Sequence, residues 1–314
     1  MESNDEMMSD PWGLALESLR AGHRAVLVFV VDHSGSVPGV TGTRAVVSDQ
    51  GIAGTIGGGA AEKQLLEQAR EHTGGPQIVR FRHTPGEGGT MCSGLQVFAV
   101  IQLNPDDEAP LASMVETLAA HRTGTLAISA AGLSFSPGTA GPHNFTEDGD
   151  SWSYSGPIGL LDTLTIVGGG HVSLAFSRVM ATLPFRVVVL DDRSELPTMK
   201  ANNFAHELRV VDYADLADHV PEGDRSWVVI MTYGHNHDRH ALEQLLNRNF
   251  AYLGVMGSKA KIRQMFAAII ADGVAESALE AIRAPVGISI GSHTPEEIAV
   301  SIAAEIVAVR NGRM

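Results

Sequence analysis

The chain reads Leu164-Thr-Ile-Val-Gly-Gly-Gly-His-Val-Ser173 near its middle and Arg186-Val-Val-Val-Leu-Asp-Asp-Arg193 shortly afterwards. An apolar run leads into three glycines, a helical segment follows, and a second apolar run ends on two acids. This order predicts a β-strand, a tight turn, an α-helix and a parallel strand, which together open a dinucleotide-binding unit. Because the unit begins halfway along 314 residues, we expect the first half to be a separate domain.

Apolar runs and helical segments alternate through the rest of the second half. Strands are expected at 163–168, 186–191, 207–211, 227–232 and 251–255, and helices at 171–182, 213–218, 238–248, 258–271 and 295–310. Such alternation favours a parallel sheet with helices on both faces. The sequence therefore predicts an α/β protein whose C-terminal domain, at residues 163–314, is a Rossmann-like parallel-sheet domain.

The first half also mixes strands with helices. Strands are expected at 25–31, 44–48, 51–56, 77–82, 95–103 and 124–130, and helices at 11–22, 60–72 and 108–120. This pattern predicts an N-terminal α/β domain with a mixed sheet at residues 11–135. Residues 136–162 are rich in Ser, Gly and Pro and are expected to form a linker, with a hairpin near Trp152 and Tyr154.

Composition argues against several classes of function. The 36 acidic residues outnumber the 22 basic ones, and the net charge of −14 argues against binding to nucleic acid or to an anionic membrane. No apolar run approaches the roughly 20 residues that span a bilayer, and the acidic N-terminus lacks the apolar core of a signal peptide. Cys92 is the one cysteine, which rules out an intrachain disulfide. We therefore expect a soluble, cytoplasmic protein.

The turn Gly168-Gly-Gly170 is the first candidate site. Gly168 permits the tight turn, Gly170 lets the backbone approach a pyrophosphate, and Gly169 lies between them. A small Ser173 stands where the fingerprint usually has Gly or Ala. A phosphate would bind at the N-terminus of the following helix. His171, which starts that helix, is expected either to line the cleft or to pack against the sheet.

Two acids and an arginine end the second strand of this unit. Asp191 lies about 20 residues after the glycines, where an acid binds ribose hydroxyls in a dinucleotide site. Asp192 beside it is expected to repel a 2′-phosphate, whereas Arg193 is expected to attract one. NAD and NADP therefore both stay open. The alternative is a retained fold with a vacated or repurposed pocket.

Cys92 is a second candidate, because its neighbours in sequence are unusual. It lies in the glycine-rich loop 83–94, and Arg80, Arg82 and His83 precede it. Basic neighbours and backbone N–H groups favour a thiolate, which can act as a nucleophile, a sulfur carrier or a soft metal ligand. The alternative is a small buried hydrophobic residue, the usual role of a lone cysteine.

A third glycine-rich turn lies before the helix expected at 60–72. Gly57, Gly58 and Gly59 form a second candidate anion cradle there. The alternative is a simple turn from strand to helix. Glu62, in the first helical turn, is interpreted as an acid that the helix dipole favours.

Polar residues follow the expected strand 227–232, at the sheet edge where α/β proteins bind ligands. Thr232, His235 and Asp238 are candidates for contacting a cofactor, and His235, His237 and Asp238 also suggest a metal site. Histidines two residues apart point to opposite sides of an extended chain, so a metal site needs a turn here. Asp238 also fits a helix N-cap.

A further polar segment follows the expected strand 251–255. Gly257, Ser258 and Lys259 are candidates for binding a cofactor. Ser258 also fits the cap of the next helix, and Lys259 is either a phosphate partner or a solvated lysine. The run Thr294-Pro-Glu-Glu297 is typical of a helix start with a capping box.

Motifs in both halves occur in one order along nearly the whole chain. They are Gly35-Ser-Val-Pro-Gly39, Gly54-Thr-Ile-Gly-Gly-Gly59 with Glu62, Met91-Cys-Ser-Gly94, Val167-Gly-Gly-Gly-His-Val172, Asp191-Asp-Arg193, Met231-Thr-Tyr-Gly-His-Asn-His-Asp238, Tyr252-Leu-Gly-Val-Met-Gly-Ser-Lys259 and Pro285-Val-Gly-Ile-Ser-Ile-Gly291. Together they resemble the XdhC/CoxI family, accessory factors for molybdenum hydroxylases such as xanthine dehydrogenase. Two departures are Cys92-Ser-Gly94 for the family's Cys-Gly-Gly and Gly168-Gly-Gly-His171 for its Gly-Ala-Gly-His.

The resemblance implies a protein that binds molybdenum cofactor (molybdopterin), promotes its sulfuration and delivers it to an apo-hydroxylase. It implies that Cys92 holds the cofactor, near its molybdenum or its dithiolene end, which makes the sulfur a candidate ligand of the molybdenum. The implied partners are the xanthine-dehydrogenase-like apo-hydroxylase and a cysteine desulfurase. The family also suggests a homodimer.

Three functions follow from these observations. The first is a cofactor carrier and maturation factor, which is favoured over a turnover enzyme. The second is an NAD(P)-dependent oxidoreductase that uses the Rossmann-like domain, although the sequence lacks an evident Tyr-x-x-x-Lys or similar hydride-transfer group. The third is a scaffold that docks a hydroxylase and its sulfurase, with both pockets vestigial.

Overall fold

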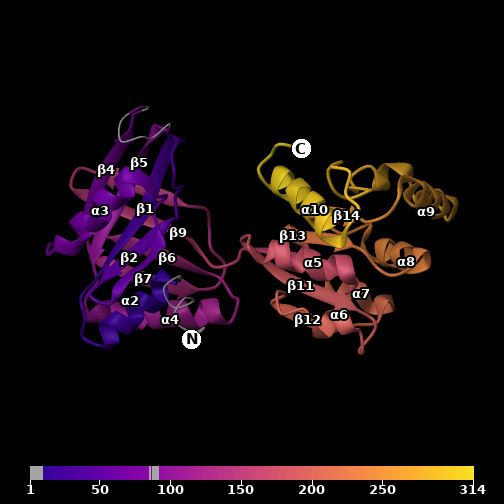
Figure 1. Cartoon of the computed structure of the whole chain (residues 1–314), viewed down its shortest axis with the longest axis horizontal. Coiled ribbons are helices and arrows are strands. Elements are labelled where there is room, and N and C mark those ends of the chain that lie inside the picture. Colours follow the sequence, from indigo (N-terminus) through magenta and orange to yellow (C-terminus); the bar gives the residue numbers. More distant parts are fainter. Residues whose placement is uncertain (1–9, 85, 87–91) are drawn as a thin grey trace. The chain divides into compact units, whose positions relative to one another are not determined.

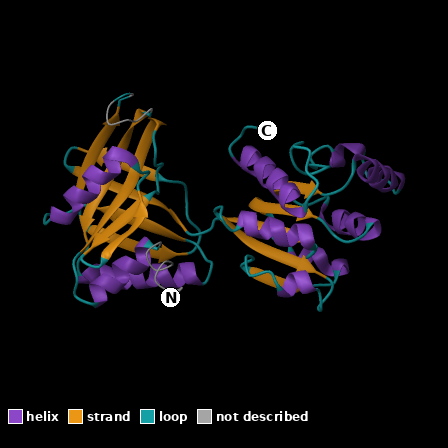
Figure 2. Cartoon of the chain, in the orientation of Figure 1, coloured by secondary structure: helices purple, strands orange, loops and turns teal. Residues whose placement is uncertain are grey.

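The computed structural model describes residues 10–84, 86 and 92–314, without the side chains of Ala60 and His235. The chain divides into two compact units, one ending at Gly159 and the other running Leu160–Met314 (Figure 1). The first unit is rich in strands, and the second has helices on both sides of one sheet (Figure 2). Each unit has its own apolar clusters.

The first unit is built on a five-stranded sheet with the order β3-β2-β1-β5-β4. Its strands are β1 (Ala25–Ser36), β2 (Arg44–Ser48), β3 (Gly51–Thr55), β4 (Gln77–His83) and β5 (Ser93–Gln102). The four described pairings are all antiparallel, whereas the sequence predicted a mixed sheet. The helix α3 (Gly59–Glu71) connects β3 to β4, and these two edge strands do not pair with each other.

The central strand β1 is buried on both faces, as its continuous apolar run predicted. Leu27 and Phe29 pack in one cluster with residues of α2 (Pro11–Arg20) and α4 (Glu108–Ala119). Val26 and its alternate neighbours pack in a second cluster with residues of α3. Alternating side chains of a strand point to opposite faces, so one strand serves both clusters.

The structure differs from the sequence prediction at residues 136–162, which were expected to form a linker. A second, antiparallel sheet with the order β7-β6-β9-β8 takes up most of this segment. Its strands are β6 (Gly124–Ser129), β7 (Gly132–Pro137), β8 (Asn144–Asp148) and β9 (Ser151–Ile158). The alternation in β9 buries Trp152 and Tyr154, and the Tyr154 ring lies 5.0 Å from that of Phe29. Serines between the aromatic residues gave this strand a linker-like composition.

The second unit is a parallel five-stranded sheet with the order β12-β11-β10-β13-β14. Its strands are β10 (Asp162–Val167), β11 (Phe185–Asp191), β12 (Glu207–Val210), β13 (Gly223–Ile230) and β14 (Phe250–Val255). Numbered within the unit, the order is 3-2-1-4-5, which is that of a Rossmann fold. The prediction of a Rossmann-like second domain is confirmed.

Helices cover both faces of this parallel sheet (Figure 1). One apolar cluster joins the sheet to α5 (His171–Met180) and α10 (Pro295–Arg310). The other joins it to α7 (Leu216–His219), α8 (His235–Leu245) and α9 (Lys259–Ala271). A short helix, α6 (Pro197–Lys200), follows β11. Among the described residues, no helix is both long enough and apolar enough to cross a membrane.

Candidate functional site

The glycine turn joins β10 to α5 at the point where the strand order reverses, the usual ligand position in such sheets. Gly168 has a φ of +111°, and a Cβ on it would lie 2.4 Å from the carbonyl oxygen of Met231. Its N–H donates to the carbonyl of Leu190 over 2.7 Å. Both the left-handed backbone and the close approach require glycine here.

Gly170 is the N-cap of α5 and leaves the start of the helix open. No described atom lies within 4 Å of the place that its Cβ would take, and no described side chain caps the helix. The first N–H groups of a helix lack partners within the helix and form the positive end of its dipole. His171, the first helical residue, is exposed. This helix start therefore has the properties of an anion site.

A cavity of about 430 Å³ lies beside the start of α5. Gly170, His171, Arg193 and Thr232, all predicted from the sequence, line it. Ser173 lines it as well, and its side chain is 1% exposed. The Ser173 hydroxyl has no hydrogen-bond partner among the described residues. Since buried hydroxyls are normally hydrogen-bonded, this one is a donor that the described residues leave unsatisfied beside the cavity.

Asp191, the predicted ribose-binding acid, is completely buried and makes four hydrogen bonds within the chain. Its Oδ2 accepts from the N–H of Gly169 (2.6 Å) and from Nη2 of Arg193 (2.8 Å). Its Oδ1 accepts from the backbone N–H (2.9 Å) and Nε (2.8 Å) of Arg193. Burial alone would raise the pKa of Asp191, but these bonds outweigh it and hold the pKa below its usual value.

Arg193 is also held by groups that lie beyond Asp191. Its guanidinium carbon lies 4.2 Å from the ring centroid of Tyr233, and its Nε lies 3.7 Å from a carboxylate oxygen of Asp192. The Tyr233 hydroxyl contacts Oδ2 of Asp192 (3.1 Å) and Nε2 of His237 (2.9 Å). Tyr233 was not predicted as a site residue. Its position directly after Thr232, at the end of a buried strand, was the available signal.

Thr232 and Asp238 form an internal network rather than two independent contacts for a ligand. The buried carboxylate of Asp238 accepts from the N–H (2.8 Å) and the hydroxyl (2.6 Å) of Thr232, and Lys261 pairs with its other oxygen. The prediction that Asp238 is an N-cap is wrong, because α8 begins at His235 with Gly234 as its N-cap. Asp238 instead ties the first turn of α8 to the chain after β13.

His237 does not form a metal centre with its described neighbours. His237 lies against Tyr233, with ring centroids 4.2 Å apart. Within the described part of the chain, no group of three or more His, Cys, Asp and Glu side chains is placed to hold a metal ion. The side chain of His235 lies outside the described residues, and the metal alternative gains no support.

The segment Gly257-Ser-Lys259 lies at the start of α9. The Ser258 hydroxyl accepts the N–H of Lys261 over 3.2 Å, which confirms the predicted cap. Lys259 is exposed. Met256, just before this segment, lines the 430 Å³ cavity.

The second glycine turn, in the first unit, is already held by a carboxylate of the chain. Glu62 accepts the N–H groups of Ile56 (2.7 Å) and Gly58 (3.0 Å), and the hydroxyl of Thr55. Burial would raise the pKa of Glu62, but these bonds outweigh it and lower the pKa. Gly57, Gly58 and Gly59 all have positive φ. Glu62 therefore already occupies donors of the predicted anion cradle.

Cys92 directly precedes β5 and is partly exposed. In the sheet register, Gly94 pairs with Gly35 of β1 and with His83 of β4. A Cβ on Gly94 would lie 2.4 Å from the carbonyl oxygen of Ser34. The structure thus brings the motifs around Gly35 and Cys92 together at one end of the sheet. Met91, in the same motif, lies outside the described residues.

A buried glutamine that was not predicted as a site residue joins these segments. Nε2 of Gln96 donates to the carbonyls of Gly39 (2.6 Å) and Ile56 (3.3 Å), and Oε1 contacts Nε2 of His83 (2.6 Å). Since Oε1 is an acceptor, the proton in this last contact belongs to His83. Three glycine-rich segments, 35–39, 54–59 and 92–94, therefore converge near one end of the five-stranded sheet. A glutamine within an apolar strand was the available signal.

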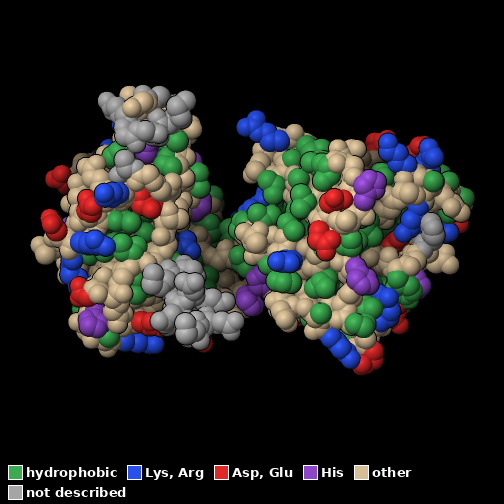
Figure 3. Space-filling view, in the orientation of Figure 1, with side chains coloured by type: hydrophobic (Ala, Val, Ile, Leu, Met, Phe, Trp, Pro, Cys, Tyr) green, Lys and Arg blue, Asp and Glu red, His purple; other side chains and the backbone are tan. Residues whose placement is uncertain are grey.

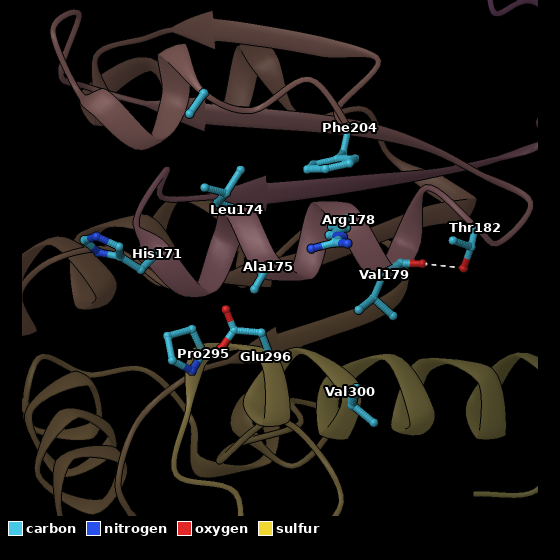
Figure 4. A pocket seen from close by; sticks show the side chains of 11 residues that line it. His171, Leu174, Ala175, Arg178, Val179, Thr182, Phe204, Pro295, Glu296 and Val300 are labelled. Carbon is cyan, nitrogen blue, oxygen red and sulfur yellow. Dashed lines mark hydrogen bonds between the residues drawn. The ribbon is translucent and has the colours of Figure 1, made fainter. Parts of the chain in front are cut away.

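A second hollow of about 590 Å³ lies over α5 and α10. In Figure 4, Ala175 and Val179 of α5 point toward Val300 of α10, whereas Leu174 lies on the side of α5 nearer to Phe204. The guanidinium carbon of Arg178 lies 5.7 Å from the centroid of the Phe204 ring. Hydrophobic side chains are exposed among polar ones on this side of the second unit (Figure 3). This groove was not predicted from the sequence.

Known protein families match parts of both units. A family model described as the XdhC and CoxI family matches residues 18–82, and one described as the XdhC Rossmann domain matches residues 164–306. The uncharacterized protein YqeB of Escherichia coli (strain K12) is 25% identical over 297 residues, which are 90% of this chain and 43% of that protein. A Bacillus subtilis (strain 168) protein, described as a probable xanthine dehydrogenase component, is 26% identical over 147 residues, 47% of this chain and 42% of that protein.

These two relatives are longer than the region that matches, so this chain spans less than half the length of each. A crystal structure described as a xanthine dehydrogenase from Bacillus halodurans matches 98% of this chain and 97% of its own, with a TM-score of 0.75 and 21% identity. That likeness shows that the fold is shared. With its two family domains in the predicted order, the chain belongs to the XdhC and CoxI family.

Proposed function

We propose that this chain is an accessory factor that binds molybdenum cofactor, supports its sulfuration and delivers it to a xanthine-dehydrogenase-type molybdenum hydroxylase. The cofactor is the cargo of such a protein rather than its own prosthetic group. Family membership supports the proposal, and so does the name of the Bacillus subtilis relative. The proposed partners are the apo-hydroxylase and a cysteine desulfurase, in the cytoplasm, with the carrier acting as a homodimer.

The backbone packing beside Cys92 is the observation that carries this proposal. Side chains are excluded at Gly35 and Gly94, where a Cβ would lie 2.7 Å and 2.4 Å from main-chain oxygens. The hydrogen bonds of Gln96 fix the neighbouring loop at Gly39. This packing fixes the backbone beside a partly exposed thiol, and a thiolate is a soft ligand that suits thiophilic metals. Cys92 is therefore the proposed ligand of the molybdenum.

The test compares the molybdenum and pterin content of protein purified from a host that makes the cofactor. Wild type is expected to retain both, and Cys92→Ala is expected to lose most of each, because the sulfur ligand is gone. Ser93→Gly restores the glycine of the family motif and is the matched control, with retention unchanged or higher. Equal retention by Cys92→Ala would remove the thiol from the mechanism.

An NAD(P)-dependent oxidoreductase is the alternative that the strand order and the glycine turn favour. It requires a carboxylate that is able to accept ribose hydroxyls. The carboxylate of Asp191 already accepts four hydrogen bonds, one from Gly169 and three from Arg193. The carrier is therefore the preferred function, and calorimetry with NAD+ and NADP+ tests the alternative.

A further inference from the structure

We propose that Arg193 closes the ribose-binding end of the Rossmann pocket, so that the pocket accepts a phosphomonoester and rejects NAD and NADP. The inference concerns the second unit and rests on the proposed function only where the natural ligand is taken to be a phosphate-bearing cofactor. It makes Arg193 a specificity-determining residue.

The first step is that Asp191 has no acceptor capacity left. An ionised carboxylate offers about four lone-pair sites. The N–H of Gly169 takes one of them, and the backbone and side chain of Arg193 take three. The ribose of a dinucleotide would need at least one of these sites. Asp191 is also completely buried, so a ribose reaches it only if Arg193 moves.

The second step is that several groups hold Arg193 in place. Its guanidinium makes a bidentate contact with Asp191 and stacks on the ring of Tyr233. The hydroxyl of Tyr233 is in turn bonded to Asp192 and His237, which fixes the ring under the guanidinium. Side-chain hydrogen bonds and charge pairs of this geometry are among the stronger polar contacts in proteins.

The third step concerns the extra phosphate of NADP. Arg193 alone would attract a 2′-phosphate. In the structure its charge is balanced by Asp191, at 2.8 Å, and by Asp192, at 3.7 Å. Two carboxylates around one guanidinium leave a net negative charge at this end of the pocket, which disfavours the binding of a second anion there.

The fourth step is that the phosphate end of the pocket stays open. Gly170 has free space at its Cβ position, and Ser173 lines the cavity with a buried hydroxyl that has no described partner. A phosphate at the start of α5 would meet free N–H groups and the positive end of the helix dipole. The Met231 and Met256 side chains line the same cavity and offer an apolar surface to the rest of the ligand.

The first experiment measures NAD+ binding by calorimetry for wild type, Arg193→Ala and Arg178→Ala. Arg178 is the matched control, since it also stacks on an aromatic ring of this unit but does not contact Asp191. Wild type and Arg178→Ala are expected to bind NAD+ weakly. Arg193→Ala is expected to bind it at least about tenfold more tightly, because hydrogen bonds to the freed carboxylate become available.

Adding Asp191→Asn to Arg193→Ala is expected to cancel the gain, which shows that the gain comes from the carboxylate. Circular dichroism confirms that each variant is folded, and Arg193→Gln replaces Arg193→Ala if the latter unfolds. Tight NAD+ binding by wild type would overturn the inference, as would an unchanged affinity in folded Arg193 variants.

The second experiment tests the phosphate end with phenyl phosphate as the probe. Gly170→Asp places a carboxylate at an N-cap, which is a favoured position for Asp, so the helix start remains folded while its N–H groups are taken up. Wild type and Gly170→Ala are expected to bind phenyl phosphate, and Gly170→Asp is expected to lose the binding. No binding by wild type, or equal binding by all three, would overturn the phosphate site.

These outcomes are separate from those of the molybdenum test. Cys92→Ala leaves the residues of the Rossmann pocket unchanged, so its binding of phenyl phosphate is expected to equal that of wild type. Loss of molybdenum retention together with intact phosphate binding would support both proposals. Retained molybdenum in Cys92→Ala would count against the role of Cys92 and would leave the phosphate site of the Rossmann pocket unaffected.

Discussion

Glu62 and Asp191 play the same part at two glycine turns of this chain. Each carboxylate accepts backbone N–H groups of its turn, Ile56 and Gly58 in one case and Gly169 in the other. Glycine turns expose donors that would otherwise attract an outside anion. An internal carboxylate takes up these donors, so a glycine-rich motif alone does not establish a phosphate site.

Glu62→Gln is expected to lower the free energy of unfolding of the first unit by about 1–2 kcal/mol at neutral pH, because a charged acceptor of backbone N–H groups becomes neutral. Urea unfolding measures the change. Glu67→Gln, an exposed position on the same helix, is the control and is expected to leave stability nearly unchanged.

The stability difference between wild type and Glu62→Gln is also expected to depend on pH. The folded-state pKa of Glu62 is lowered, so its contribution is fully present above its unfolded-state pKa of about 4.3 and is lost as the pH falls through the folded-state pKa. The stability difference between wild type and Glu62→Gln is therefore expected to shrink below about pH 4. A difference that stays constant into that acidic range would contradict this assignment.

At the scale of elements, alanine substitutions in the glycine turn between β3 and α3 are expected to differ in their cost to stability. Gly57 has a φ of +121° and a Cβ position only 2.4 Å from the backbone nitrogen of Gly39, whereas Gly58 has a φ of +78° and open space around it. Gly58 also has a ψ of −177°, a conformation that is essentially restricted to glycine, so Gly58→Ala is expected to cost about 1–3 kcal/mol from backbone conformation alone. Gly57→Ala adds a steric clash and is expected to cost clearly more. Thermal unfolding of the two variants checks the order, and equal losses would contradict it.

Most strands and helices were predictable from the sequence because their apolar residues recur at the period of a strand or a helix. The exceptions have physical reasons. Strand β9 alternates Trp152 and Tyr154 with serine, so the composition of 136–162 indicated a linker although the period of this strand indicated β-structure. The sheet predicted to be mixed is antiparallel in its described pairings. The helix α3 connects β3 to β4, but these strands lie at opposite edges of the sheet and do not form a parallel pair.

The candidate site was predictable in its location but not in its hydrogen bonds. The sequence indicated the glycine turn, the acid after β11 and the arginine beside it. It could not show that Arg193 folds back on Asp191, because that contact depends on the three-dimensional turn after β11. Tyr233, Gln96 and Lys261 were missed for the same reason, since each acts through partners distant in sequence.

At the scale of the whole molecule, the chain joins a first unit, which carries the partly exposed thiol of Cys92, to a Rossmann domain. Asp191, the acid that the sequence predicted to bind ribose, is buried and hydrogen-bonded within the Rossmann domain. A hydride-transfer enzyme would need that acid for its dinucleotide, whereas a carrier needs a soft ligand and an anion site. The fold shared with the Bacillus halodurans structure extends over 98% of this chain, so both domains have counterparts in that structure.

The central claim is that this chain holds molybdenum cofactor and passes it on. The most direct measurement mixes the loaded, purified chain with an apo-hydroxylase of the xanthine dehydrogenase type, separates the two proteins and determines molybdenum and pterin on each over time. Molybdenum and pterin are expected to move together from the chain to the hydroxylase, whose activity rises in step. A chain that carries no cofactor from a cofactor-producing host, or one whose cofactor stays bound in the presence of the apo-hydroxylase, would contradict it.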